Sequence, residues 1–261
     1  MVPTNKSLGQ HWLKNPDVLA DIADLADLTG DDVVLEIGPG LGTLTSRLLA
    51  RAKSVVAVEF DKALADKLPG QFPGKNLTVI NQDILKFDLS TLPKGYKVVA
   101  NVPYYITSKI IQLLAESTNP PETIVLLVQK EVAERLSAKP GDYSILAISA
   151  QIYYEVTTDM VVPADMFTPP PKVDSQVVKL ARRGQPLVDE SSRADFFRLV
   201  KAGFSAKRKK LRSSLAGGLQ LDKSEVENLL IQTDISPDAR AEDLTINQWL
   251  TLLNAYAIIK G

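Results

Sequence analysis

The chain has 261 residues, of which 45% are hydrophobic, and its 30 lysines and arginines nearly balance its 31 aspartates and glutamates. This length provides for one large domain, or a large and a small one, and the net charge of −1 favours no particular class of partner. The absence of cysteine excludes disulfides, thiolate metal sites and cysteine nucleophiles, and the single histidine, His11, leaves too little for a catalytic triad or a two-histidine metal site.

The N-terminal segment MVPTNKSLGQHWLKN is polar and lacks the apolar stretch of a signal peptide. No run of about 18 apolar residues, the length that would span a membrane, occurs in the chain. We therefore expect a cytoplasmic protein with no membrane contact and no metal, and we expect it to be a monomer.

Apolar strands alternate with helical patterns through the first part of the chain. Continuous Val/Ile/Leu runs of this kind are typical of a parallel sheet that helices cover on both faces. The predicted strands are residues 33–38, 54–61, 77–83, 96–103 and 123–129, and the predicted helices are residues 16–28, 43–52, 62–68, 108–117, 130–138 and 144–152.

The pattern changes after the fifth strand. Residues 153–162 and 174–183 read as two strands without a helix between them, which indicates an antiparallel edge. The polar stretch GQPLVDESS reads as a linker, and residues 193–260 are helical in pattern throughout. We therefore expect an α/β domain at residues 1–184, with a mostly parallel seven-stranded sheet, and a small all-helical domain at residues 185–261.

The stretch EIGPGLG forms a glycine-rich turn between the first strand and a helix, with Gly38, Gly40 and Gly42 in G-x-G-x-G spacing. Glycine is required where the backbone takes a positive φ or closely approaches a ligand. The nicotinamide fingerprint G-x-G-x-x-G would need glycine at position 43, where this chain has threonine. The spacing instead favours an S-adenosylmethionine-binding, Rossmann-like methyltransferase domain.

Acidic residues follow the next two strands, Glu59 after the second and Asp83 after the third. Each could simply cap a helix or face solvent. Carboxyl ends of parallel strands share one edge of the sheet, however, and open α/β sheets bind ligands there. We expect Glu59 to accept hydrogen bonds from ribose hydroxyls and Asp83 to accept one from the adenine amine, with Ile84 beside the ring.

The fourth strand ends in NVPYYI, residues 101–106. The segment could be a strand end with core aromatic residues. In the functional interpretation, the Asn101 side-chain oxygen and the Val102 carbonyl accept the two hydrogens of an adenine amine and stabilise the positive charge that develops on it. Pro103 stiffens the turn and Tyr104 stacks on the base, which must leave its helical stack to reach the pocket.

Nearly the whole chain resembles the KsgA-type ribosomal RNA adenine dimethyltransferases of the bacterial small subunit. The segments that carry the resemblance are SLGQHWL, EIGPGLGTLT, VEFD, NQD, NVPYYI, LLVQKEVAERL, FTPPPKVDSQVVKL, FSAKRKKLRSSL and RAEDLT. The resemblance implies transfer of two methyl groups from S-adenosylmethionine to each of two adjacent adenosines near the 3′ end of 16S ribosomal RNA, in an immature 30S subunit.

The resemblance also implies site residues. Its donor-contacting positions fall on His11, Leu13, Gly38, Glu59, Asp83 and Asn101. The family often has asparagine where this chain has His11, which could contact the donor by its ring or its backbone, or could simply pack near Trp12. Phe167 would be a second stacking plate for the target base, or would pack in the core.

A basic segment without acidic residues lies near the start of the helical part, at Lys201, Lys207, Arg208, Lys209, Lys210 and Arg212. Such a segment is often only a solvated helix face, but beside a base-modifying site it predicts contacts with RNA phosphates.

Four other functions compete with this prediction. They are a large-subunit RNA methyltransferase that confers macrolide resistance, a DNA adenine methyltransferase, a ribosome-assembly checkpoint in which catalysis is secondary, and a nicotinamide dehydrogenase. The FTPPPKVDS segment and the basic segment favour the small-subunit enzyme.

Overall fold

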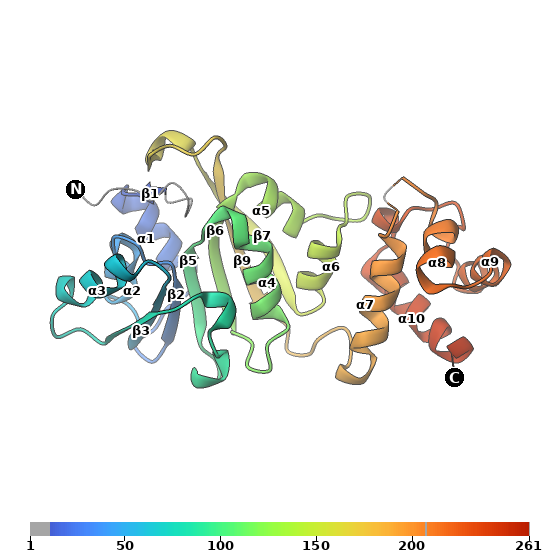
Figure 1. Cartoon of the computed structure of the whole chain (residues 1–261), viewed down its shortest axis with the longest axis horizontal. Helices are drawn as coiled ribbons and strands as arrows, with labels where there is room; N and C mark the ends of the chain where they lie inside the picture. Colours follow the sequence, from blue (N-terminus) through green and yellow to red (C-terminus); the bar gives the residue numbers. More distant parts are fainter. Residues whose placement is uncertain (1–10, 207, 261) are drawn as a thin grey trace. The chain divides into compact units, whose positions relative to one another are not determined.

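The computed structural model describes residues 11–206 and 208–260. The chain forms two compact units, which Figure 1 shows coloured along the sequence. The first comprises Met1–Glu134 and Tyr154–Arg183, and the second comprises Arg135–Tyr153 and Gly184–Gly261. Across the described ranges, no helix is long and apolar enough to cross a membrane.

A seven-stranded sheet forms the centre of the first unit, in the order β4-β3-β2-β5-β6-β9-β7. Strands β4, β3, β2, β5 and β6 run parallel, and β9 is antiparallel to both of its neighbours. This arrangement confirms the predicted mostly parallel sheet with an antiparallel edge. The strands are β2 (Val33–Ile37), β3 (Ser54–Glu59), β4 (Leu77–Asn81), β5 (Lys97–Asn101), β6 (Thr123–Gln129), β7 (Tyr154–Val162) and β9 (Ser175–Arg182).

Helices connect these strands, and the first of them shows how the local sequence determines where a helix begins and which side it buries. Asn15 caps the first helix by accepting hydrogen bonds from two backbone N–H groups, and Pro16 follows at the first helical position. Leu19 and Ile22 on this helix pack against the valines of one face of the sheet. The helices are α1 (Pro16–Asp24), α2 (Thr43–Leu48), α3 (Lys62–Gln71), α4 (Thr107–Ala115), α5 (Lys130–Leu136) and α6 (Ile145–Gln151).

A separate two-stranded sheet joins segments that lie about 150 residues apart. It consists of β1 (Trp12–Leu13) and β8 (Phe167–Thr168), which pair antiparallel. Leu13 and Phe167 face each other in register, and each is only 2% exposed within the same apolar cluster as α1. The sequence patterns did not predict this sheet, because two-residue strands show no periodicity. Of the two locations predicted for Phe167, the structure shows the core.

An ion pair at the amino ends of the parallel strands fixes the start of β5, the strand that ends at Asn101. Lys97 is buried there, and its ammonium group donates to the carbonyl of Asp27 at 2.8 Å and to the carboxylate of Asp32 at 3.1 Å. Burial by itself would raise the pKa of Asp32, but hydrogen bonds from Thr29 and from Lys97 outweigh burial and lower it. The ion pair therefore anchors β5 at the end remote from the pocket.

The second unit is built around four long helices, α7 (Arg193–Gly203), α8 (Leu211–Leu219), α9 (Lys223–Gln232) and α10 (Ile246–Lys260). Its core contains the fully buried Trp249, whose ring stacks on Phe204 with 6.0 Å between the centroids. A Cβ atom at Gly203 would lie 2.5 Å from the Trp249 ring, so only glycine allows the indole to approach α7 this closely.

Replacing Phe167 with alanine should lower the free energy of unfolding by about 3–5 kcal/mol, because the change leaves a cavity in the core. Replacing Phe60, which is 60% exposed, should change it by less than about 0.5 kcal/mol. Urea denaturation of both variants measures the difference. A stable F167A protein that had lost only activity would contradict the core assignment.

Candidate functional site

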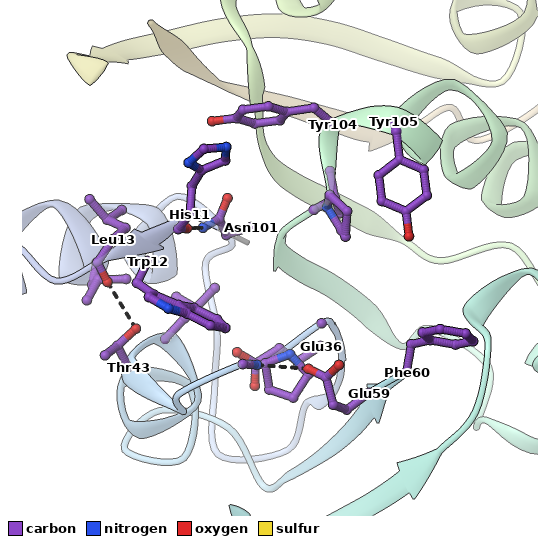
Figure 2. Close-up of a pocket in the computed structure, with 17 residues that line it drawn as sticks. His11, Trp12, Leu13, Glu36, Thr43, Glu59, Phe60, Asn101, Tyr104 and Tyr105 are labelled. Carbon is purple, nitrogen blue, oxygen red and sulfur yellow. Dashed lines mark hydrogen bonds between the residues drawn. The ribbon is translucent and has the colours of Figure 1, made fainter. Parts of the chain in front are cut away.

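A pocket lies at the carboxyl ends of β2, β3 and β5, and Figure 2 shows the seventeen residues that line it. We call it the glycine-loop pocket. Its walls come from the β1 segment, the loop between β2 and α2, the end of β3 and the turn after β5. The last three of these segments come together because the carboxyl ends of parallel strands meet at one edge of the sheet, whereas β1 belongs to the separate two-stranded sheet.

Two of the three predicted loop glycines line the pocket, and the third serves packing. Gly38 and Gly40 have φ of 66° and 57°, the left-handed region that favours glycine. A Cβ atom at Gly40 would lie 2.3 Å from the ring of Trp12, which crosses the pocket beside the loop. A Cβ atom at Gly42, in contrast, would lie 2.8 Å from Leu68, and Gly42 is not among the pocket-lining residues.

Glu59 ends β3 as predicted, and it ties the loop to its neighbouring strand. One carboxylate oxygen accepts from the N–H of Gly40 at 3.0 Å, and the other accepts from the N–H of Asp61 at 2.8 Å. Burial raises the pKa of Glu59, although these hydrogen bonds oppose the shift. Each oxygen retains a second lone pair, so Glu59 could still accept hydrogen bonds from the hydroxyls of a ligand.

Glu36 was not among the predicted site residues, yet it forms part of the pocket wall. Its side chain is 1% exposed, and neither carboxylate oxygen makes a hydrogen bond with the described residues. Burial raises the pKa of Glu36 to about 8, although the nearby Thr45 hydroxyl, which does not reach hydrogen-bonding geometry, opposes the shift. The buried group is therefore mostly protonated at neutral pH, and a cationic ligand in the pocket would favour its carboxylate form.

A second hollow adjoins the pocket and shares Gly38 and Glu59 with it. Asp83 and Ile84 line this hollow at the start of the 3₁₀ helix η2 (Ile84–Lys86), which Asp83 caps by accepting from the N–H of Leu85 at 3.0 Å. Two largely exposed aromatic side chains, Phe60 and Tyr105, also line it. The hollow could hold a flat ring, with Asp83 accepting a hydrogen bond at its edge.

The turn after β5 brings Asn101, Val102, Pro103 and Tyr104 together at the mouth of the glycine-loop pocket. The Asn101 amide nitrogen lies 3.5 Å from the carbonyl oxygen of His11, and no hydrogen bond among the described residues uses its side-chain oxygen. The Tyr104 hydroxyl is 2.6 Å from the Ser175 hydroxyl on β9, which holds the phenol in place. Burial raises the pKa of Tyr104, so it remains an uncharged ring near neutral pH.

The β1 segment supplies the remaining predicted residues of the pocket. The backbone carbonyl of Leu13 accepts from the Thr43 hydroxyl at 3.1 Å, which joins β1 to the start of α2. His11 lies between Tyr104 and Asn101 in Figure 2, and its ring faces the tyrosine. Phe167 does not line the pocket, because it is buried behind β1.

The basic segment of the second unit divides into paired and unpaired cations. Lys210 pairs with Asp238 at 2.8 Å, and Arg212 pairs with Glu227 at 3.1 Å and with Asp238 at 3.4 Å. Among the described residues, no ion pair involves the three exposed cations Lys201, Arg208 and Lys209. Lys207 lies outside the described residues.

Sequence reasoning missed Glu36, Trp12, Phe60 and Tyr105, all of which line the pocket or the hollow. Glu36 did carry a signal, because it is an acidic residue within an otherwise apolar strand that is buried on both faces. In the described part of the chain, no cluster of three or more histidines and acids could hold a metal ion.

Known proteins resemble this chain over nearly its full length. The family model described as ribosomal RNA adenine dimethylase matches residues 1–258. The ribosomal RNA small subunit methyltransferase A of Dehalococcoides mccartyi (strain CBDB1) is 43% identical over 256 residues, which cover 97% of this chain and 88% of that protein. The protein of the same name from Geobacillus sp. (strain WCH70) is 42% identical over 96% of this chain and 90% of its own length.

Solved structures show the same fold. A dimethyladenosine transferase from Plasmodium falciparum superposes with a TM-score of 0.82 and 30% identity, over 95% of this chain and 98% of that one. The 23S rRNA methyltransferase ErmE superposes with a TM-score of 0.77 and 30% identity, over 94% and 98%. From the family match and the full-length similarity, the chain belongs to the ribosomal RNA adenine dimethylase family.

Proposed function

We propose that the protein transfers methyl groups from S-adenosylmethionine to the N6 atoms of two adjacent adenosines near the 3′ end of 16S ribosomal RNA, two methyls to each. The observation that carries this proposal is the Asn101–Tyr104 turn at the mouth of the pocket that Gly38, Gly40 and Glu59 form. Relatives at 42–43% identity are named for the small-subunit RNA, whereas ErmE is 30% identical. The substrate would be an immature small subunit in the cytoplasm.

The pocket and the adjoining hollow suit S-adenosylmethionine part by part. The bound donor supplies an electrophilic methyl group on a sulfonium. Gly38 and Gly40 line the space for its methionyl and ribose parts, Glu59 would accept from its ribose hydroxyls, and Asp83 and Ile84 would bind its adenine. The buried Glu36 carboxyl group would lose its proton and pair, as a carboxylate, with the donor's ammonium group of opposite charge.

The residues of the β5 turn would act on the target adenosine. The adenine amine is a weak nucleophile, because its lone pair is delocalised into the ring. The Asn101 side-chain oxygen and the Val102 carbonyl would accept its two hydrogens and stabilise the positive charge that develops on nitrogen. Tyr104 would stack on the base. After the first methylation one hydrogen remains, so a single acceptor serves the second step.

The three cations of the second unit that form no ion pair with the described residues would contact RNA phosphates. We propose Lys201, Arg208 and Lys209 for this role, because Lys210 and Arg212 are already neutralised by acidic side chains. Because of this pairing, the basic segment would offer fewer phosphate contacts than its charge count suggests. Lys207 is included in this proposal from its sequence position alone.

Asn101→Ala should reduce the single-turnover rate of methyl transfer about 100-fold, since a preorganised polar group contributes about 3 kcal/mol to the transition state. The measurement uses undermethylated small subunits and labelled S-adenosylmethionine, followed by nucleoside analysis of the RNA. The exposed Asn76, before β4, provides the control substitution N76A, which should retain the wild-type rate. Undiminished turnover by N101A, or label found only in large-subunit RNA, would contradict the proposal. An N101A protein that lacked turnover but still fully supported subunit maturation would identify the protein chiefly as an assembly checkpoint.

Binding of S-adenosylmethionine at pH 7 should release close to one proton. With its pKa raised to about 8, the Glu36 carboxyl is mostly protonated in the free protein, and pairing with an ammonium group requires the carboxylate. The donor therefore lowers this pKa, and the proton leaves. Calorimetry in buffers with different ionisation enthalpies measures the release.

Two controls isolate the role of Glu36 in this release. E36Q has no proton to lose at this position, and 5′-methylthioadenosine lacks the ammonium group, so neither combination should release the proton. Equal proton release by E36Q and the wild type would refute the pairing.

Replacing Arg208 and Lys209 with glutamine should flatten the dependence of log K for RNA on log salt by about 1.4 units, at about 0.7 per lost phosphate contact. Replacing Lys210 and Arg212 removes the same formal charge but should flatten the slope less, because their acidic partners already neutralise them. Filter binding at several salt concentrations measures both slopes. Equal salt-dependence slopes for the two double variants would show that the ion pairs of Lys210 and Arg212 do not reduce their contribution to RNA binding.

A further inference from the structure

The imidazole ring of His11 lies over the phenol ring of Tyr104 at the mouth of the glycine-loop pocket. The two centroids are 5.8 Å apart and the planes are inclined by only 19°, which is a stacked arrangement. Figure 2 shows the two rings facing each other, with Asn101 beside the imidazole. An extruded adenine on the face of Tyr104 that is turned toward His11 would therefore come into contact with the imidazole as well.

Both rings are held in orientation by a polar contact at one end. Nδ1 of His11 lies 2.7 Å from the carbonyl oxygen of Pro169, and because a carbonyl can only accept, Nδ1 carries the proton. The Tyr104 hydroxyl is bonded to Ser175. The two rings thus project from different supports, since His11 precedes β1 in the small sheet and Tyr104 follows β5 in the large one.

The buried Phe167 explains how the histidine side of this pair is supported. Phe167 and Leu13 are opposite each other in the β1–β8 sheet, and both are anchored in the core. The next residues of β8 and the loop lead to Pro169, whose carbonyl holds the imidazole. The segment FTPPP therefore contributes its phenylalanine to the core and a backbone oxygen to the site.

We propose that His11 is the second stacking plate of the target adenosine, which binds between the His11 and Tyr104 rings. This inference rests on the proposed function and refines its base-binding site. Two face-to-face contacts of about 3.5 Å each need ring planes about 7 Å apart, more than the 5.8 Å between the centroids, so the pair must open for the base to enter. Leu13 and Phe167 stay in the core, so the opening falls to the His11 side chain.

The ring and the backbone of His11 have different roles in this proposal. The ring serves the target base, whereas the backbone carbonyl faces the amide of Asn101. A role in donor binding through the ring would instead use Nε2, the nitrogen that the contact with Pro169 leaves free. The variants His11→Ala and His11→Phe distinguish these roles, because phenylalanine keeps an aromatic plate but loses both ring nitrogens.

The experiment measures kcat/KM for undermethylated small subunits and Kd for S-adenosylmethionine. We expect H11A to lose about tenfold in kcat/KM, the cost of one base–aromatic stack, and H11F to lose less than about threefold. Both variants should bind S-adenosylmethionine within about twofold of the wild type. The exposed Lys53 directly precedes β3, at the end of the strand remote from the pocket. It provides the control K53A, which should match the wild type in both measurements.

A fluorescent base reports on stacking directly. An RNA hairpin with 2-aminopurine at the target position should be quenched when bound to the wild type or H11F and brighter when bound to H11A. Equal quenching by H11A, or a loss in H11F as large as in H11A, would overturn the proposal, as would a defect confined to donor affinity. Failure of the wild type to methylate the small subunit would instead refute the proposed function, which keeps the two claims distinguishable.

Discussion

The buried carboxylate of Glu59 is the interaction on which the pocket depends. Its two oxygens accept hydrogen bonds from the backbone of the glycine loop and from the residue before α3, so one side chain joins the ends of β2 and β3. Without it, the N–H groups of Gly40 and Asp61 would lose their partner, although the Gly38 N–H would still donate to the Val58 carbonyl of β3 at 2.9 Å. The carboxylate therefore adds a side-chain link between the glycine loop and β3 to the backbone link.

The small β1–β8 sheet adds a second constraint, since it closes the pocket with residues from both ends of the first unit. The Leu13 and Phe167 side chains face the core, whereas Trp12 and the preceding His11 line the site. In this segment, residues that stabilise the core thus lie next to residues that line the pocket. Phe167 and Leu13 hold the sheet down, while His11 and Trp12 reach toward the rings and the glycine loop.

The large sheet and the strand-end residues could be predicted from sequence because both have strong local signals. Apolar runs indicate the strands. Glu59 and Asn101 are the last residues of β3 and β5, and Asp83 lies shortly after the end of β4. The β1–β8 pairing had no such signal, since two-residue strands depend on partners far away in the chain. For the same reason the prediction that Phe167 stacks on the target base is wrong, since its side chain lies in the core, and the prediction that Gly42 contacts the donor is not supported, since Gly42 packs against α3. Ion pairing of Lys210 and Arg212 likewise depends on tertiary neighbours.

The two tryptophans of the chain have different surroundings, one in each unit. Trp249 is completely enclosed by apolar helices, whereas Trp12 is partly open to solvent beside the glycine loop. Indole emission shifts to longer wavelength with polarity, so the blue part of the intrinsic spectrum belongs to the helical unit and the red part to the pocket. The protein therefore carries two native optical probes, and each unit can be followed spectroscopically without a label.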